Sequence, residues 1–256
     1  MLIQTLAAAA TSAAPQNKFG LVEVLFPNGH PNWIPLSTFS ILLIMSVGSF
    51  FILFTKLFEQ KKIFGQYKGI GTFWRAASLK EGVGKLEKNS AWRQIVEDGI
   101  AAEDQTTKLV DQSEAHDWLH GSLARSEASI NSKLAGGLPF LATVGATAPF
   151  IGLFGTVVGI YGALINIGLA GSASIDKVAG PVGEALIMTA LGLLVAVPAV
   201  LAYNFLQSRN KRIAELLTGF STDVLANIAS HGAVKPAVSA AAAPKPAAPA
   251  AAAPKK

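Results

Sequence analysis

The sequence predicts an all-α integral membrane protein with three transmembrane helices, whose long helices extend into the cytoplasm. Only 14% of the 256 residues are charged and 51% are hydrophobic, whereas soluble domains carry roughly 25% charged residues. The mean hydropathy is +0.42. Three nearly uncharged stretches each hold about 20 or more apolar residues, enough to cross a bilayer as a helix. The remaining polar residues are too few to cover three such helices in a soluble protein.

The distribution of Lys and Arg predicts how the chain crosses the membrane. Lys18 precedes the first apolar stretch, whereas Lys56, Lys61, Lys62 and Lys68 follow it. Because cytoplasmic segments are enriched in Lys and Arg, the N-terminus is expected outside and the C-terminus in the cytoplasm. The expected order is an outer arm at 1–35, a transmembrane helix at 36–57, a cytoplasmic helical domain at 58–137, a transmembrane helix at 138–166, a short outer loop at 167–181, a transmembrane helix at 182–207, a cytoplasmic helix at 208–232 and a tail at 233–256.

The two ends of the chain carry distinct signals. The opening "MLIQTLAAAATSAAPQ" has the small residues of a signal-peptide cleavage region but lacks a basic start. It is either a cleaved signal or an uncleaved arm. The closing "AVKPAVSAAAAPKPAAPAAAAPKK" consists largely of Ala, Pro and Lys, a composition that cannot bury a core and predicts disorder.

The segment at 58–137 is expected to be mostly helical. Ser90 is a suitable N-cap, and the apolar side chains that follow it have helical spacing. They are Trp92, Ile95, Val96 and Ile100. The segment "LKEGVGKLEKNS" before them is interrupted by glycine and predicts a short helix with turns. The last helix of this segment is expected to continue across Gly136 and Gly137 into the second transmembrane helix.

Several kinds of chemistry lack support in the sequence. The chain has no Cys and a net charge of +5, but its cations form no aromatic-interleaved patch for nucleic acid. His116 and His120 have the i, i+4 spacing of two metal ligands without a third, which favours surface histidines over a metal site. The glycine-rich "GLFGTVVGIYG" lacks the G-K-[ST] of a phosphate loop. Neither an enzyme nor a cofactor is therefore expected.

Small residues form continuous faces on the second and third predicted transmembrane helices. Such faces let helices approach closely in lipid, so these two are expected to pack together or against a neighbouring subunit. The first face comprises Gly145, Ala148, Gly152, Gly155, Gly159 and Gly162. The second comprises Ala185, Thr189, Gly192, Ala196 and Ala199.

Glu184 is the acid in the apolar run "GPVGEALIMTALGLLVAVPAVLAYNF". A charged acid at the centre of a membrane helix costs about 2.5–3.5 kcal/mol on insertion scales, and such acids commonly serve ion pathways. Glu184 lies in the first turns of its helix, however. A carboxylate there also stabilises the helix N-terminus, so the residues alone leave both interpretations open.

Two long motifs resemble the TolQ/ExbB/MotA family of proton-channel motor subunits. They are "ATAPFIGLFGTVVGIYGAL" and "GPVGEALIMTALGLLVAVPAVLAYN", and the similarity is strong over about residues 133–212. The segments "ILLIMSVGSFFILFTKLFEQ" and "KLEKNSAWRQIVEDG" resemble the ExbB branch. By motif position, Glu184 matches the family's intramembrane glutamate, and Thr156 and Thr189 match polar residues that line the channel.

The resemblance implies a bacterial inner-membrane complex with a periplasmic N-terminus and a cytoplasmic C-terminus. A ring of about five copies would surround a dimer of a single-span, ExbD-type partner. Proton-motive force would then energise outer-membrane transport through a TonB-type protein. Two alternatives remain: a TolQ-like motor for envelope maintenance, and a non-conducting membrane scaffold whose glycine faces serve assembly only.

Overall fold

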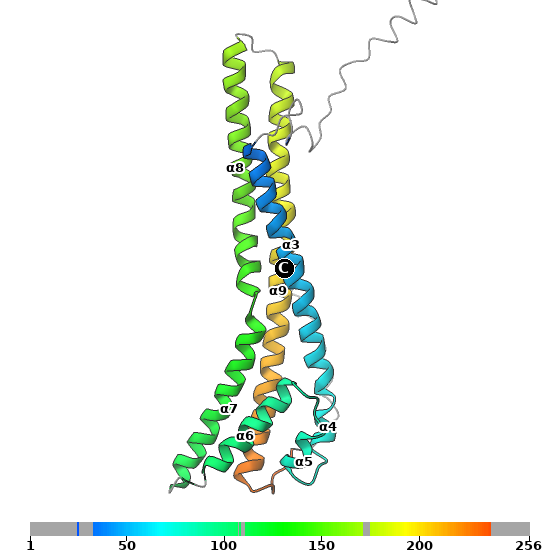
Figure 1. Ribbon diagram of the computed structural model, residues 1–256, viewed down its shortest axis with the longest axis vertical. Coiled ribbons are helices and arrows are strands. Elements are labelled where there is room, and N and C mark those ends of the chain that lie inside the picture. Colours follow the sequence, from blue (N-terminus) through cyan, green and yellow to red (C-terminus); the bar gives the residue numbers. More distant parts are fainter. Residues whose placement is uncertain (1–24, 26–32, 107, 109–110, 171–174, 237–256) are drawn as a thin grey trace, which may run out of the picture. The chain divides into compact units, whose positions relative to one another are not determined.

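The computed structural model describes Leu25 and residues 33–106, 108, 111–170 and 175–236, and its regular elements over these residues are all α-helices (Figure 1). The remaining parts of the predicted arm, outer loop and tail lie outside the described residues. The longer helices are α3 (Trp33–Tyr67), α6 (Ala91–Thr106), α7 (Gln112–Ala135), α8 (Leu138–Ala170) and α9 (Ile175–Ala229), with the short α4 (Ile70–Phe73) and α5 (Leu79–Val83) between α3 and α6.

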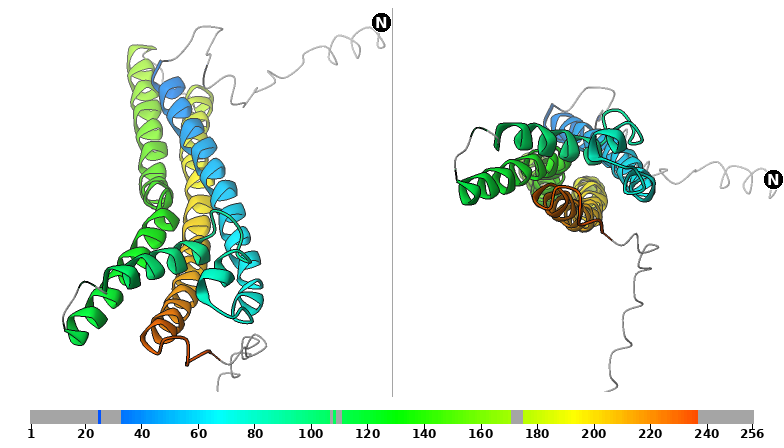
Figure 2. Two further views of the ribbon diagram at one scale, coloured as in Figure 1. Left: turned by 60° about the horizontal axis from the view of Figure 1, so that its bottom comes forward. Right: turned by 90° about the horizontal axis from the view of Figure 1, so that it is seen from below.

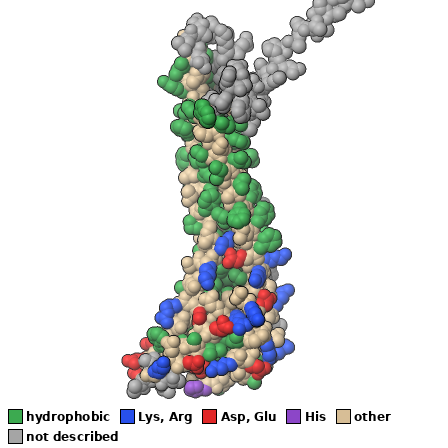
Figure 3. Space-filling model, viewed as in Figure 1, with side chains coloured by type: hydrophobic (Ala, Val, Ile, Leu, Met, Phe, Trp, Pro, Cys, Tyr) green, Lys and Arg blue, Asp and Glu red, His purple; other side chains and the backbone are tan. Residues whose placement is uncertain are grey.

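The chain divides into two compact units. The first, called the span unit, contains the described residues up to Glu59 and those of 134–210. The second, called the polar unit, contains 60–133 and the described residues from Lys211 onward. On the face shown in Figure 3, hydrophobic side chains cover the span unit, and Lys, Arg, Asp and Glu side chains crowd the polar unit.

The span unit consists of α8 and the adjoining parts of α3 and α9, which lie side by side (Figures 1 and 2). Its core is built from medium-sized and small side chains, including Leu42 of α3, Val144 and Ala148 of α8, and Ala196 of α9. A second cluster joins Leu141 to Leu206. Three helical segments in the described chain are long and apolar enough to cross a membrane, as the sequence predicts.

Many large apolar side chains of the span unit point away from this core. Ile44 is 70% exposed, Phe150 is 71% exposed and Leu194 is 68% exposed. Exposed apolar surface of this extent is suited to lipid or to another membrane helix rather than to water.

The prediction that one helix runs across Gly136 and Gly137 is wrong. Helix α7 ends at Ala135 and α8 begins at Leu138. Gly137 has φ +85°, a conformation that glycine adopts without steric cost. A Cβ atom there would also lie 3.0 Å from Cγ2 of Ile52. The glycine pair therefore ends one helix and lets the chain pass close to α3.

The polar unit has an aromatic core. Trp92 is fully buried, as are Ile95 and Val96 of the same helix. The Trp92 ring meets Phe220 of α9 at 5.5 Å between centroids, and its Nε1 donates a hydrogen bond to the Ile63 carbonyl at 3.2 Å. The predicted N-cap is confirmed, because Ser90 Oγ accepts a hydrogen bond from the Arg93 amide at 3.1 Å. The predicted short helix before it is α5.

Candidate functional site

Helices α8 and α9 approach each other closely where two glycines face each other. A Cβ atom on Gly152 would lie 3.0 Å from Gly192 Cα and 2.6 Å from the Met188 carbonyl oxygen. A Cβ on Gly192 would lie 2.7 Å from the Ala148 carbonyl oxygen. Because these obstacles are backbone atoms, only glycine fits at either position without moving a helix.

The other predicted packing glycines of α8 differ in their surroundings. A Cβ on Gly155 would lie 3.2 Å from Met188 Cβ, and one on Gly159 would lie 2.9 Å from Ala185 Cβ. For Gly162, no described atom lies within 4 Å of the corresponding position. The structure thus brings Gly155 and Gly159 against α9, whereas no atom of the described residues lies against Gly162.

Thr156 and Thr189, which the sequence places on different helices, are hydrogen-bonded to each other through their hydroxyl groups. Thr156 is only 6% exposed. Its Oγ1 also lies 3.0 Å from the Ala185 carbonyl oxygen and 3.2 Å from that of Gly152. A threonine hydroxyl has one proton to donate and can accept as well. Thr156 therefore links a side chain and a carbonyl of α9 to its own helix.

Glu184 lies in α9 immediately before Ala185, and its side chain is outside the described part of the structure. The next residue, Ala185, contacts α8 through both its backbone and its side chain. The Ala185 carbonyl lies against the Thr156 hydroxyl, and Ala185 is 4% exposed where it meets Gly159. The position of Glu184 along the bundle is therefore set by Thr156 and Gly159.

Thr38 of α3 adds a buried hydroxyl that sequence reasoning missed. It is 3% exposed, and its Oγ1 lies 3.3 Å from the position of a Cβ on Gly155. The hydroxyl bonds to the Pro35 carbonyl at 2.9 Å and to the Ile34 carbonyl at 3.1 Å within its own helix. A threonine in the apolar run "LSTFSILL" is a weak signal, because such local bonding satisfies it without any function.

The histidine pair has no metal-binding surroundings in the described chain. His116 and His120 are both exposed on α7. Among the residues that the structure describes, no three His, Cys, Asp or Glu side chains gather as a metal site would require.

Comparison with known proteins gives consistent similarities. Residues 87–218 match the model of the MotA/TolQ/ExbB proton channel family. The chain is 39% identical over 204 residues to a biopolymer transport protein ExbB of Xanthomonas campestris pv. campestris, covering 75% of this chain and 79% of the relative. It is 35% identical over 213 residues to an ExbB of Neisseria meningitidis, covering 79% and 94%. A Tol-Pal system protein TolQ of Pseudomonas aeruginosa is 48% identical over 81 residues, or 32% of this chain and 35% of the relative.

Proposed function

Because the chain belongs to the MotA/TolQ/ExbB proton channel family, we propose that it is the ring-forming subunit of an inner-membrane motor. This motor uses proton-motive force to energise TonB-dependent transport across the outer membrane. ExbB is favoured within the family because the ExbB relatives match over most of both chains, whereas TolQ matches over about a third.

The proposed placement is a multi-pass protein of the bacterial inner membrane. The span unit lies in the bilayer, with the N-terminus in the periplasm, and the polar unit and C-terminus lie in the cytoplasm. The Lys and Arg distribution supports this orientation. The exposed apolar side chains of the span unit support its contact with lipid.

Several copies and two kinds of partner complete the proposed machine. About five copies form a ring around a dimer of an ExbD-type single-span protein, which passes work to a TonB-type protein. One chain supplies a single intramembrane acid and few polar groups, which is too little for a continuous proton path. Among the described residues, no atom lies within 4 Å of a Cβ on Gly162, so a neighbouring helix could pack against this small residue.

In the proposed mechanism, Glu184 takes up and releases the proton, and the hydroxyls of Thr156 and Thr189 line its path. The observation that carries this proposal is the hydrogen bond between the two threonines, next to the Ala185 carbonyl. Hydroxyl groups can both donate and accept, so they can relay a proton or hold water. An elementary charge that crosses the membrane potential releases about 2.3 kcal/mol per 100 mV.

Replacement of Glu184 by Gln tests the proposal directly. Gln keeps the shape and hydrogen-bonding ability of Glu but cannot titrate. Glu184→Gln should insert, assemble and bind the partner, yet abolish energy-dependent uptake through a TonB-type receptor. Glu184→Asp, which still titrates, is the matched control and should retain partial uptake. Near-normal uptake by Glu184→Gln would favour the scaffold or helix-end roles, for which the loss is at most about 1 kcal/mol of helix-end stabilisation.

A TolQ-like motor is the second candidate, favoured by the higher identity over the shorter matched segment. The two candidates share the same proton site and differ in their client. A deletion strain separates them: loss of TonB-type receptor uptake with an intact envelope supports the ExbB assignment, whereas detergent sensitivity with normal uptake supports the TolQ assignment.

A further inference from the structure

The polar unit contains a cavity of about 240 Å³ between the α4–α5 region, α6 and the end of α9. This volume lies below the roughly 300 Å³ at which small-molecule pockets begin. It is suited to a single large side chain, as at the anchor positions of protein interfaces. The apolar part of its lining includes Trp74, Leu79, Ile100 and Ile228.

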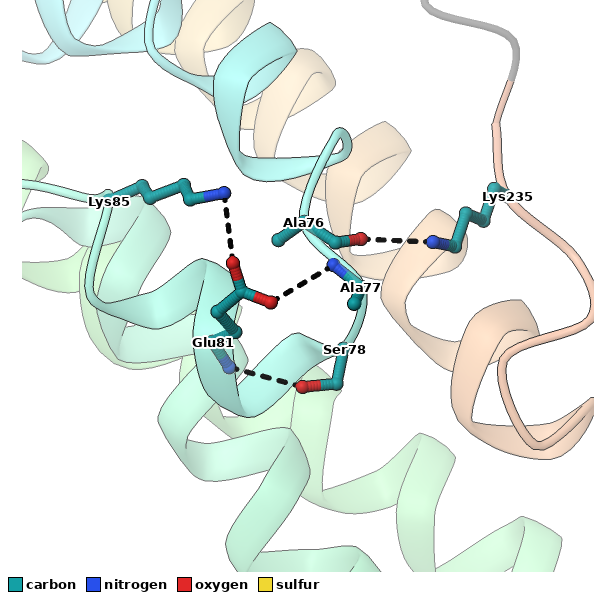
Figure 4. Close-up of polar contacts among 6 residues, drawn as sticks. All are labelled: Ala76, Ala77, Ser78, Glu81, Lys85 and Lys235. Atoms are coloured by element: carbon teal, nitrogen blue, oxygen red, sulfur yellow. Dashed lines mark hydrogen bonds and ion pairs between the residues drawn. The ribbon is translucent and has the colours of Figure 1, made fainter.

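Hydrogen bonds fix the wall formed by the α4–α5 loop. The amide of Glu81 donates to Ser78 Oγ at 3.3 Å, and the Glu81 carboxylate accepts from the Ala77 amide at 3.2 Å (Figure 4). This pair is a variant of the capping box, in which the carboxylate accepts from the amide before the N-cap residue instead of from the N-cap amide. The loop therefore has a defined conformation without any occupant of the cavity.

The opposite wall is fixed in a similar way where α9 ends. The Asn227 side-chain amide donates to the Val234 carbonyl at 2.7 Å, and the Gly232 amide donates to the Asn227 carbonyl at 2.8 Å. Lys235 Nζ then donates to the Ala76 carbonyl at 2.9 Å and joins the two walls (Figure 4). The cavity is thus preformed.

Two lysine side chains line the cavity, and their positive charge favours an occupant with negative charge. Lys80 and Lys235 both contribute to its lining, together with one acid of the described residues, Glu103. Lys80 Nζ is 3.7 Å from Asp104 Oδ1, but both side chains are about two-thirds exposed. A pair of this kind is weak, so Lys80 can interact with another carboxylate.

A complementary feature lies on α7 of the same unit. Trp118 is 41% exposed, with Glu114 one turn before it and Asp117 adjacent, both exposed. The Arg125 guanidinium lies 5.3 Å from the centre of the indole ring and covers one part of it. With two acids and one Arg around it, this exposed tryptophan has the size that the cavity requires and a surrounding that is net negative.

Trp118 belongs to α7, which contributes none of the described residues that line the cavity. Helix α7 is on one side of α6, and α4 and α5 are on the other (Figures 1 and 2). The two features therefore meet between copies of the chain rather than within one copy.

We propose that Trp118 of one subunit inserts into this cavity of the next subunit, with Glu114 and Asp117 facing Lys80 and Lys235. A contact between two different surfaces of the same chain is heterologous, and its repetition gives a ring when the rotation between neighbours closes. The inference rests on the self-assembly proposed above and adds the contact that joins neighbours outside the membrane.

The C-terminal tail is the competing occupant, because residues 237–256 follow directly after the Lys235 region. Its charged residues are Lys245, Lys255 and Lys256. They have the same sign as Lys80 and Lys235. Charge complementarity therefore favours the acidic α7 segment of a second copy.

Cysteine cross-linking in the full-length membrane protein tests the contact, since the chain has no native Cys. One tagged copy carries Gly121→Cys, one turn beyond Trp118, and a second carries Ala77→Cys at the cavity. Gly121 tolerates a side chain, because the nearest atom, Arg125 Nη1, would lie 3.7 Å from its Cβ. A short bismaleimide should link the two tagged copies. The exposed Ser129→Cys, farther along α7, is the matched control and should give little product.

Changes at Trp118 test the anchor within the same cross-linking pair. Trp118→Ala should lower the yield at least about fivefold, as expected for a buried aromatic anchor, whereas Trp118→Phe should retain most of it. Lys80→Glu should also lower the cross-linking yield, because it places a negative charge opposite Glu114 and Asp117.

The size of the solubilised complex is measured on the same samples. An intact complex without the Gly121–Ala77 product overturns this contact but leaves the proposed function standing. A monomeric protein contradicts the proposed ring itself. A product between Ala242→Cys in the tail and Ala77→Cys of the same chain, at comparable yield, would identify the tail as the occupant and overturn the inference.

Discussion

Gly152 of α8 and Gly192 of α9 lie against each other without an intervening side chain, so that a Cβ atom on Gly152 would come within 3.0 Å of Gly192 Cα. This approach lets the two helices run close enough for Thr156 to reach both Thr189 and the Ala185 carbonyl. The hydrogen bonds of Thr156 therefore depend on the glycines that let the two helices come close. A wider helix separation would break the threonine pair.

Gly152→Ala is expected to destabilise the protein. Alanine gains up to about 1 kcal/mol over glycine in helix propensity. Here its methyl group would meet the Met188 carbonyl at 2.6 Å, and overpacking of this kind costs about 1–3 kcal/mol. The thermal unfolding midpoint of the solubilised protein should therefore fall.

Gly162→Ala is the matched control on the same helix, because no described atom lies within 4 Å of its Cβ position. Its unfolding midpoint should stay the same or rise. A midpoint for Gly152→Ala that equals or exceeds the unsubstituted value would show that α8 and α9 do not approach as described.

The helix pattern of this protein can be predicted well from its sequence, and the pairing of the helices less well. Steps of three and four between small residues identify a face, but they leave open which partner covers it. The structure shows that α9 covers Gly152, Gly155 and Gly159, whereas the same spacing at Gly162 brings no described atom within 4 Å of its Cβ position. Spacing alone cannot make this distinction, because it depends on which side chains the facing helix presents.

Local and distant features also differ in how far they can be predicted. The Ser90 cap follows from nearby residues and is confirmed. The break at Gly136 and Gly137 is also local, because a Gly-Gly pair marks turns and loops, and the expectation of a continuous helix overlooked this signal. The contact between Lys235 and Ala76 spans 159 residues and has no sequence signature. Such contacts arise only after the unit has folded.

Glu81→Gln should destabilise the polar unit at neutral pH. Its hydrogen bond with Lys85, the bond from the Ala77 amide and the Lys85 charge hold the pKa of the Glu81 carboxyl below its ordinary value of 4.5. A lowered pKa contributes stability above pH 4.5, and this is lost as the pH falls through the folded-state pKa. The difference in unfolding midpoint between Glu81→Gln and the unsubstituted protein should therefore shrink below about pH 4.5.

Tryptophan fluorescence at several pH values measures this difference, because Trp74 and Trp92 lie in the core of the same unit. Glu215→Gln, at an exposed site on α9, is the control and should show a smaller effect. A Glu81→Gln difference that does not change with pH would argue against the capping role of the carboxylate.

Asp223→Asn should have the opposite effect and raise the unfolding midpoint at neutral pH. Burial raises the pKa of the Asp223 carboxyl above its ordinary value of 3.8. The folded state thus binds the proton more tightly than the unfolded state does, and stability is lost as the pH rises from 3.8 through the folded-state pKa. Asparagine avoids the charged form, so the variant should unfold at a higher temperature at pH 7, and its advantage should shrink toward pH 3.8. An unchanged midpoint at pH 7 would contradict this.

Thr156→Val tests whether the buried hydroxyl serves proton movement as well as packing. Valine keeps the branched shape but loses the bonds to Thr189 and to the Ala185 carbonyl. The loss of stability should be about 1 kcal/mol, whereas energy-dependent uptake should fall far more if the hydroxyl lines the proton path. Thr156→Ser restores the hydroxyl and should restore uptake. Thr143→Val is the matched control, because Thr143 is exposed on α8 and its hydroxyl donates only to the Pro139 carbonyl in the described contacts. Full uptake by an assembled Thr156→Val protein would leave Thr156 with a packing role alone.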